Sequence, residues 1–235
     1  MRSSRRSCAS NNTLGRVVRR IGSLGAGLLG AKLLFSLAIQ LWPIPTPPWA
    51  RRLLHSRWRR YYRAPRRTLA LLGIRPGMRV LELGPGSGLF TLEAARLLQD
   101  QGQLVCVDLQ MAMLRPLKQD IRAAELRTVF LQAATAERLA LSDASFDLVL
   151  AIAVLPMVRD KLQALHELRR VLKPGGMLAV SEEILEPEYV PALLMRYWCR
   201  RARFTLVAQI RTGWWYLLLF RRQTSSVRIS LPRDI

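Results

Sequence analysis

Hydrophobic and polar positions follow two different rhythms along residues 65–222. Short apolar runs, such as residues 78–83 and 146–151, are followed by longer stretches in which apolar positions recur with a helical period. This alternation is typical of an α/β domain built on a parallel sheet. We expect strands near residues 78–83, 103–108, 128–131, 146–151, 176–182, 203–209 and 214–221, and helices near residues 67–72, 88–100, 111–125, 159–172 and 190–201.

The last two expected strands follow each other directly, through Arg211, Thr212 and Gly213. So short a connection joins antiparallel strands, because parallel neighbours need a crossover of a dozen or more residues. The pattern therefore predicts a doubly wound α/β domain over residues 65–222. Its seven-stranded sheet is mostly parallel and ends in an antiparallel hairpin, and residues 223–235 form a C-terminal tail.

A different pattern precedes this domain, because residues 21–42 are almost continuously apolar and carry a single charge, Lys32. A helix needs about 20 such residues to cross the hydrocarbon core of a bilayer. The proline-rich residues 43–48 end the stretch, and Trp42 and Trp49 lie on either side as interfacial anchors. We expect one transmembrane helix over 21–42. A helix lying on the membrane surface, or packed on the domain, is the alternative.

Positive charge is concentrated in this N-terminal part. The formal net charge is +21, and residues 1–81 contain 17 Arg or Lys but no Asp or Glu. Residues 1–20 are expected to be a basic, disordered N-terminus, although their Arg- and Ser-rich composition also suits a mitochondrial transit peptide. Arginines are denser after the predicted span than before it, so the positive-inside rule puts the domain on the cytoplasmic side.

Residues 43–64 combine the proline-rich linker with a basic amphipathic helix. Placed on a helix, Trp58, Tyr61 and Tyr62 share an apolar face, whereas Arg59 and Arg63 lie on the opposite one. Such a helix suits an anionic membrane surface. Its apolar face is equally suited to packing on the domain.

The candidate chemistry begins at the first strand of the domain, which ends in Glu82 and is followed by glycines at alternate positions, Gly84, Gly86 and Gly88. A strand, a glycine-rich turn and a helix N-terminus form a cradle where backbone comes close to a nucleotide-like ligand. The spacing is G-x-G-x-G after an acid, which differs from the G-x-G-x-x-G of the dinucleotide fingerprint. An NAD-dependent reductase is therefore a poor match.

Four strings in sequence order extend this motif. They read VLELGPGSGLF from Val80, LVCVD ending at Asp108, SFDLV from Ser145, and LRRVLKPGG ending at Gly176. Together they resemble the class I S-adenosylmethionine-dependent methyltransferases, in the broad subgroup that includes the ubiquinone and menaquinone C-methyltransferases. The resemblance implies a Rossmann-like fold over residues 65–222 and S-adenosylmethionine as the cofactor.

The resemblance also implies the cofactor-binding residues. Glu82 helps to position the methionine end of the cofactor, and Asp108 accepts hydrogen bonds from both ribose hydroxyls. Many family members carry an Asp for the adenine amino group where this chain has Thr135, so a weaker hydroxyl contact or the backbone of Ala136 replaces it. The expected cofactor-binding residues are Glu82, Gly84, Gly86, Gly88, Asp108, Leu109, Thr135, Ala136 and Ala151.

The acceptor side of the site shows no catalytic base. Residues 151–158, after the fourth strand, are entirely apolar, although family members that act on polar substrates often place His, Asp or Asn there. An apolar lining suits a lipophilic acceptor, or catalysis by positioning alone. His55 or Tyr61 would be a base brought in from the N-terminal segment. Glu182 and Glu183 are expected to be solvated acids at the rim of the site, with attraction of a cationic acceptor as the alternative.

These observations predict a membrane-associated methyltransferase that acts on a small or lipophilic acceptor, such as a quinone or a lipid. With three scattered cysteines and two histidines, no metal site is expected. An RNA or protein methyltransferase is the first alternative, but the basic clusters flank an apolar span instead of covering the domain, so a nucleic-acid partner is not expected. A cofactor-binding scaffold without turnover is the second, because Thr135 replaces an expected acid.

Overall fold

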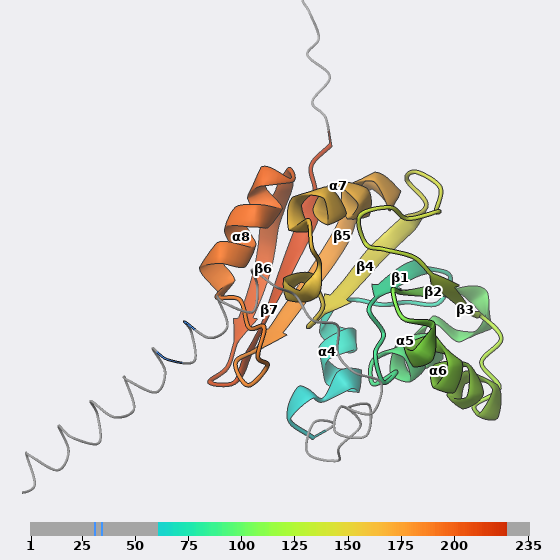
Figure 1. Cartoon of the computed structure of the whole chain (residues 1–235). Coiled ribbons are helices and arrows are strands. Elements are labelled where there is room, and N and C mark those ends of the chain that lie inside the picture. Colours follow the sequence, from blue (N-terminus) through green and yellow to red (C-terminus); the bar gives the residue numbers. More distant parts are fainter. Residues whose placement is uncertain (1–30, 32–33, 35–60, 225–235) are drawn as a thin grey trace, which may run out of the picture.

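The computed structural model describes residues 61–224 together with Ala31 and Leu34. Its centre is a seven-stranded sheet in the order β3-β2-β1-β4-β5-β7-β6 (Figure 1). The strands are β1 (Arg79–Leu83), β2 (Gln103–Asp108), β3 (Val129–Ala133), β4 (Phe146–Ile152), β5 (Leu172–Glu183), β6 (Phe204–Arg211) and β7 (Trp215–Arg222). The helices are α4 (Pro65–Leu71), α5 (Thr91–Leu98), α6 (Met111–Ala123), α7 (Lys161–Val171) and α8 (Ala192–Arg201), with short 3-10 turns η2 (Gln99–Gln101) and η3 (Leu155–Met157).

The sheet has the predicted topology. Strands β1 to β5 pair in parallel. Strand β7 lies between β5 and β6 and is antiparallel to both, and β6 and β7 form the C-terminal hairpin. The chain order reverses beside β1, because β1 pairs with β2 on one edge and with β4 on the other. In open α/β sheets, ligands bind beyond the carboxyl ends of the strands at such a point.

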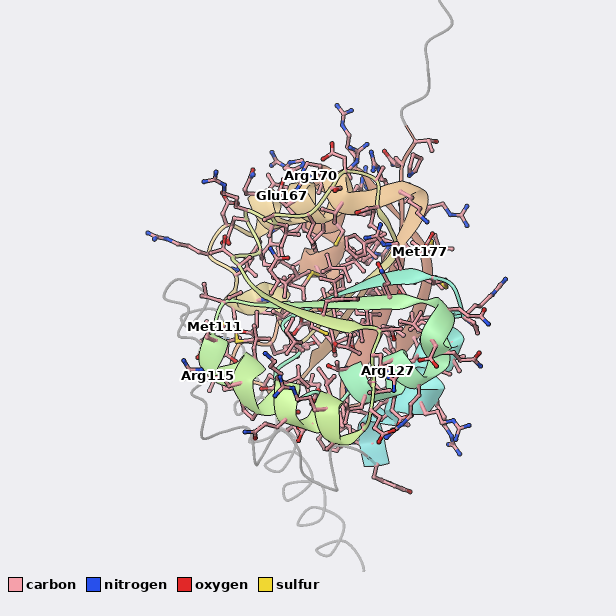
Figure 2. The ribbon with its side chains drawn as sticks, turned by 90° about the vertical axis from the view of Figure 1, so that its right-hand side faces the viewer. Met111, Arg115, Arg127, Glu167, Arg170 and Met177 are labelled. Carbon is pink, nitrogen blue, oxygen red and sulfur yellow. The ribbon has the colours of Figure 1, made fainter. Side chains whose placement is uncertain are left out.

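Helices cover both faces of the sheet. Figure 1 shows α4, α5 and α6 on one side and α7 and α8 on the other. Figure 2 shows the same division from a second direction, with Met111 and Arg115 of α6 below the sheet and Glu167 and Arg170 of α7 above it. Each side buries its own apolar cluster, one involving α4 and α5 and the other involving α7 and α8. The strands between them are apolar on both faces, as expected of a parallel sheet buried on both sides.

Two element boundaries differ from the sequence-based expectation by three residues or more. Helix α5 begins at Thr91 instead of near residue 88, because the glycine-rich turn continues to Phe90 before the helix starts. Strand β5 begins at Leu172, directly after α7, and passes through Lys173 to Gly176. The residues between the expected helix and the expected strand form a distortion inside β5, since Gly175 has a φ of 76° and the pairing with β4 shifts register nearby.

The N-terminal predictions fall mostly outside the described residues. The expected transmembrane helix over 21–42, the basic N-terminus over 1–20 and most of the tail over 223–235 lie there, apart from Ala31 and Leu34 within the span. Among the residues that the structure describes, no helix is long and apolar enough to cross a membrane.

The end of the predicted amphipathic helix is described, and there the face assignment is wrong. Tyr61, expected on the apolar face, is 81% exposed, whereas Arg63, expected on the polar face, is buried. The guanidinium of Arg63 lies over the rings of Phe90 and Trp215, 5.4 and 5.2 Å from their centroids. Helical periodicity alone did not reveal this burial, because it depends on acidic and aromatic partners far away in the sequence.

Candidate functional site

A cavity of about 650 Å³ opens at the carboxyl ends of β1, β2, β4 and β5, where the sheet order reverses. Its walls come from the glycine-rich turn after β1, the end of β2, the segment after β3 and the apolar segment after β4. Of the residues predicted to bind the cofactor, seven line it: Glu82, Gly84, Gly86, Asp108, Leu109, Thr135 and Ala136. The fold therefore brings together side chains and backbone that are separated by more than fifty positions in the sequence.

Two glycines of the turn, Gly86 and Gly88, serve different purposes. A Cβ at Gly88, where φ is 83°, would lie 2.5 Å from Cδ1 of Leu117, so this glycine allows α6 to pack against the turn. Gly88 does not line the cavity, although it was predicted to bind the cofactor. In this structure its role is in packing. Gly86 lines the cavity at a φ of 54°, and a Cβ there would meet only the carbonyl oxygen of Gly84, at 4.0 Å. Open space above a left-handed glycine is what close approach of a ligand to backbone requires.

Glu82 is a buried carboxyl group beneath this turn. It accepts a 2.6 Å hydrogen bond from Oγ1 of Thr91, the first residue of α5, and lies 3.5 Å from Sγ of Cys106 on β2. Burial raises the pKa of Glu82 to about 7, against the lowering effect of the two hydrogen bonds. Glu82 thus ties the start of α5 to the end of β1 and presents a titratable group to the cavity.

Asp108 ends β2 and holds the glycine-rich turn in place. Its Oδ1 accepts a 2.8 Å hydrogen bond from the backbone N–H of Gln110, and the backbone N–H of Gly86 also bonds to the carboxylate. Burial raises the pKa of Asp108, and these backbone donors oppose the rise. The carboxylate is pre-oriented at the cavity wall, where it can accept hydrogen bonds from vicinal hydroxyl groups.

The segment after β3 forms the next part of the wall. Thr135 and Ala136 line the cavity, and Thr135 pairs with Arg138 in an isolated bridge. Glu137 also lines it, and its Oε1 accepts a 3.2 Å hydrogen bond from the backbone N–H of Asp160, just before α7. Opposite, Leu109 is 61% exposed and provides an apolar surface of the kind that contacts a planar base.

The prediction for Ala151 needs correction. Ala151 is fully buried in the apolar cluster under α7 and α8, and it is not among the lining residues. Its successors Ile152 and Ala153 line the cavity instead, and Ala153 adopts a left-handed φ of 52° with its N–H bonded to the carbonyl oxygen of Ser181 at 2.7 Å. The strand alternation places the neighbouring side chain, not that of Ala151, toward the ligand.

Glu182 and Glu183 were expected to be solvated, and this prediction is wrong. They are 1% and 2% exposed at the end of β5, which pairs with β4 on one edge and β7 on the other. Glu182 lines the cavity, whereas Glu183 pairs with the buried Arg63 and accepts a hydrogen bond from the hydroxyl of Tyr62. The uninterrupted apolar run of residues 177–180 was a signal for burial, because such runs are typical of strands covered on both faces of a parallel sheet.

None of the candidate bases in the sequence reaches the cavity within the described part of the chain. Tyr61 is 81% exposed and is absent from the lining. His55 lies outside the described residues. Within residues 61–224 there is also no group of three or more His, Cys, Asp or Glu side chains placed to hold a metal ion.

The features of this cavity fit a nucleoside-containing cofactor such as S-adenosylmethionine. Asp108 is placed for ribose hydroxyls, Leu109 for the face of a base, and the open side of Gly86 for close approach to backbone. The volume also falls within the range of about 300–1,000 Å³ that is usual for small-molecule sites.

Comparison with known protein families agrees with this interpretation of the cavity. The family described as "Methyltransferase domain" matches residues 81–180, which run from β1 to β5. Ubiquinone/menaquinone biosynthesis C-methyltransferases UbiE are similar over a somewhat longer stretch. The protein of Vibrio parahaemolyticus is 37% identical over 138 residues, covering 57% of this chain and 51% of its own length. That of Shewanella baltica is 37% identical over 130 residues, covering 55% and 49%.

The chain thus spans about half the length of these curated relatives. Among solved structures, a SAM-dependent methyltransferase from Aquifex aeolicus superposes with a TM-score of 0.71 at 20% identity, covering 75% of this chain and 99% of that one. An arsenic(III) S-adenosylmethionine methyltransferase from Chlamydomonas reinhardtii gives 0.54 at 22% identity, covering 69% and 66%. At such identities, these structures support the fold.

Proposed function

We propose that this chain, which carries a class I S-adenosylmethionine-dependent methyltransferase domain, transfers a methyl group to a small lipophilic acceptor of the quinone type. The observation that carries the proposal is a single cavity with two chemically different ends. One part of its wall holds Asp108 and the glycine-rich turn, and another consists of the apolar side chains Ile152, Ala153, Val154, Pro156, Met157 and Val158. The similarity to UbiE proteins supports a ring carbon as the methyl acceptor.

The residues of the cofactor end bind and orient. The Asp108 carboxylate, fixed by backbone N–H groups, would accept hydrogen bonds from the ribose hydroxyls, and Thr135 and Ala136 would contact the base. Glu82 holds the start of α5 through Thr91, and thereby the shape of the turn. When bound, S-adenosylmethionine supplies an electrophilic methyl group on a sulfonium sulfur.

The acceptor end excludes water and positions the ring. Val154, Pro156 and Met157 present apolar surface to the cavity, and the 3-10 turn η3 holds them beside the end of β4. Methyl transfer is an in-line displacement, so holding the two reactants in contact supplies a large part of the rate acceleration. A reduced quinone ring is electron-rich, and it matches both the apolar wall and the need for a nucleophilic carbon.

The experiment is to incubate the purified protein with methyl-labelled S-adenosylmethionine and a short-chain isoprenoid hydroquinone, in parallel with total RNA and a soluble protein fraction. We expect label on a ring carbon of the hydroquinone. Label in RNA or protein alone would overturn the proposed acceptor class. Cofactor binding without label in any fraction would favour a scaffold without turnover.

We also propose that the protein works at a membrane surface, with its domain on the cytoplasmic side. The supporting observation is the outer face of α8. Leu193 and Tyr197, one helical turn apart, are 77% and 53% exposed and lie among the exposed Arg196, Arg200 and Arg201. An apolar and basic face suits an anionic bilayer.

The experiment is sedimentation with anionic vesicles at low salt. Residues 61–224 should sediment with the vesicles, and the double variant Leu193→Glu, Tyr197→Glu should not. Equal vesicle binding by the double variant would contradict the proposal.

A further inference from the structure

Glu182 is a buried carboxyl group at the acceptor end of the cavity. Its side chain projects from the end of β5, beside Ser181, which pairs with Ile152 of β4, and opposite Tyr216 of β7. It lines the cavity and is 1% exposed, and in the described part of the chain its Oε1 has no hydrogen-bond partner. Buried polar atoms are almost always hydrogen-bonded in folded proteins, so this oxygen points to a ligand group.

Two neighbouring polar groups are engaged elsewhere. The hydroxyl of Tyr216, on the adjacent strand, donates a 2.7 Å hydrogen bond to the carbonyl oxygen of Val190. The nearby cation Arg63 forms its ion pair with Glu183. The protein itself therefore supplies no bond to Oε1 of Glu182 from these groups.

The surroundings also favour the uncharged acid. Burial raises the pKa of Glu182 well above its usual range, and the nearby carboxylates of Glu186, Glu183 and Glu188 act in the same direction, whereas Arg63 opposes them. An undissociated carboxyl group has one O–H donor as well as an acceptor oxygen. It can therefore bind a hydroxyl or a carbonyl oxygen equally well.

The facing wall makes this carboxyl distinctive. Residues 152–158 carry no polar side chain, so along this wall a ligand can form only apolar contacts through side chains. A flat ring that lies against Val154 and Met157 has Glu182 available to one of its substituents. Glu186 and Glu188 also line the cavity, but both are only partly buried. Glu182 therefore offers a buried directional contact, which can fix the orientation of a ligand and so decide specificity.

We propose that Glu182 is the specificity-determining residue of the acceptor site, and that its carboxyl group hydrogen-bonds a ring oxygen of the acceptor. This inference rests on the proposed function and specifies it: the acceptor is an oxygenated ring, oriented with one hydroxyl or carbonyl toward β5. A cationic amine would need the opposite protonation state, because it pairs with a carboxylate.

The test compares Glu182→Gln, Glu182→Leu and the control Glu93→Gln, which removes an exposed ion pair on α5. The probe is the short-chain isoprenoid hydroquinone, with kcat and KM measured for methyl transfer and Kd for S-adenosylmethionine. We expect Glu182→Leu to raise KM for the hydroquinone about tenfold or more, because the variant loses one buried hydrogen bond to the acceptor. Glu182→Gln, which is neutral and keeps a donor and an acceptor, should stay within about threefold of wild type. Kd for the cofactor should be unchanged in all three variants.

A second measurement on the wild-type protein covers the case in which Glu182→Leu does not fold. The wild-type protein should have a higher KM for an analogue that lacks one ring oxygen than for the hydroquinone itself. Glu182→Gln should show the same ratio of the two KM values. An equal KM for both ring compounds would overturn the inference.

The outcomes separate the two proposals. If the wild-type protein methylates the hydroquinone and Glu182→Leu behaves as wild type, this inference fails and the proposed function stands. If Glu182→Gln is as impaired as Glu182→Leu, the negative charge is what matters and the oxygen contact is refuted. If the wild-type protein binds the cofactor but never methylates the hydroquinone, the proposed function fails and the inference fails with it.

Discussion

Arg63 and Glu183 form an ion pair closed off from solvent, with 3.2 Å between Nε and Oε1 and side chains that are 1% and 3% exposed. Arg63 precedes α4, and Glu183 ends β5, so the pair fixes the residues just before α4 against the end of β5. The hydroxyl of Tyr62 bonds to the same carboxylate, and the rings of Phe90 and Trp215 lie against the guanidinium.

Removing one member of this pair should be strongly destabilising. Replacement of Arg63 by Met leaves the Glu183 carboxylate buried without its cation, a change that typically costs about 3–5 kcal/mol. We expect this loss in the free energy of urea unfolding. Arg96→Met is the matched control, because its pair with Glu93 is exposed and contributes roughly 0–1 kcal/mol. Equal losses in the two variants would show that burial of the Arg63 pair is not what matters.

Two glycines of the turn should respond differently to substitution. Gly88→Ala places a Cβ against Leu117 at a left-handed φ, and should cost about 2–4 kcal/mol of stability through overpacking and backbone strain. Gly86→Arg projects into open space at the cavity, so its main effect should be loss of S-adenosylmethionine binding. Calorimetric titration and thermal unfolding of both variants distinguish the roles. Gly86→Arg with wild-type affinity for the cofactor would refute the site.

Asp108→Asn tests the ribose contact. The amide keeps the size of the side chain but loses the charge, and hydrogen bonds to a charged group contribute about 1.5–3 kcal/mol. We expect Kd for S-adenosylmethionine to rise about 10- to 100-fold. Asp100→Asn, on the exposed turn η2, is the control that should leave Kd unchanged. An unchanged Kd in Asp108→Asn would remove Asp108 from the cofactor site.

Glu82 should make the stability of the cofactor-free protein depend on pH. Its pKa in the folded state is about 7, above the ordinary 4.5, so the folded state favours the protonated carboxyl. The contribution is complete below pH 4.5 and is lost as pH rises through about 7, which corresponds to roughly 3 kcal/mol. Glu82→Gln removes this dependence, so the variant should gain stability relative to wild type between pH 5 and pH 8 in urea unfolding. If the difference in unfolding free energy between Glu82→Gln and wild type were the same at pH 5 and at pH 8, the prediction would be contradicted.

The sequence was most informative where function depends on local backbone geometry. The motif around Gly84 to Gly88, with Asp108 one strand further, predicted a cofactor cradle, and seven of the nine proposed residues line one cavity. The exceptions have local causes. Ala151 points into the core because strand side chains alternate, and Gly88 faces Leu117 of α6, a helix that is distant in sequence.

The alternation of apolar runs and helical stretches was enough to determine an α/β domain with an antiparallel C-terminal hairpin, because periodicity and connection length are local properties of the chain. Only the tertiary structure decided the surroundings of charged groups. Glu182 and Glu183 look like solvated acids in sequence, and Arg63 looks like part of a polar helix face. Their burial follows from β5 lying between two other strands and from aromatic rings contributed by Phe90, just before α5, and by Trp215 of β7. Whether a charge is buried depends on which distant segments pack around it, and no short stretch of sequence contains that information.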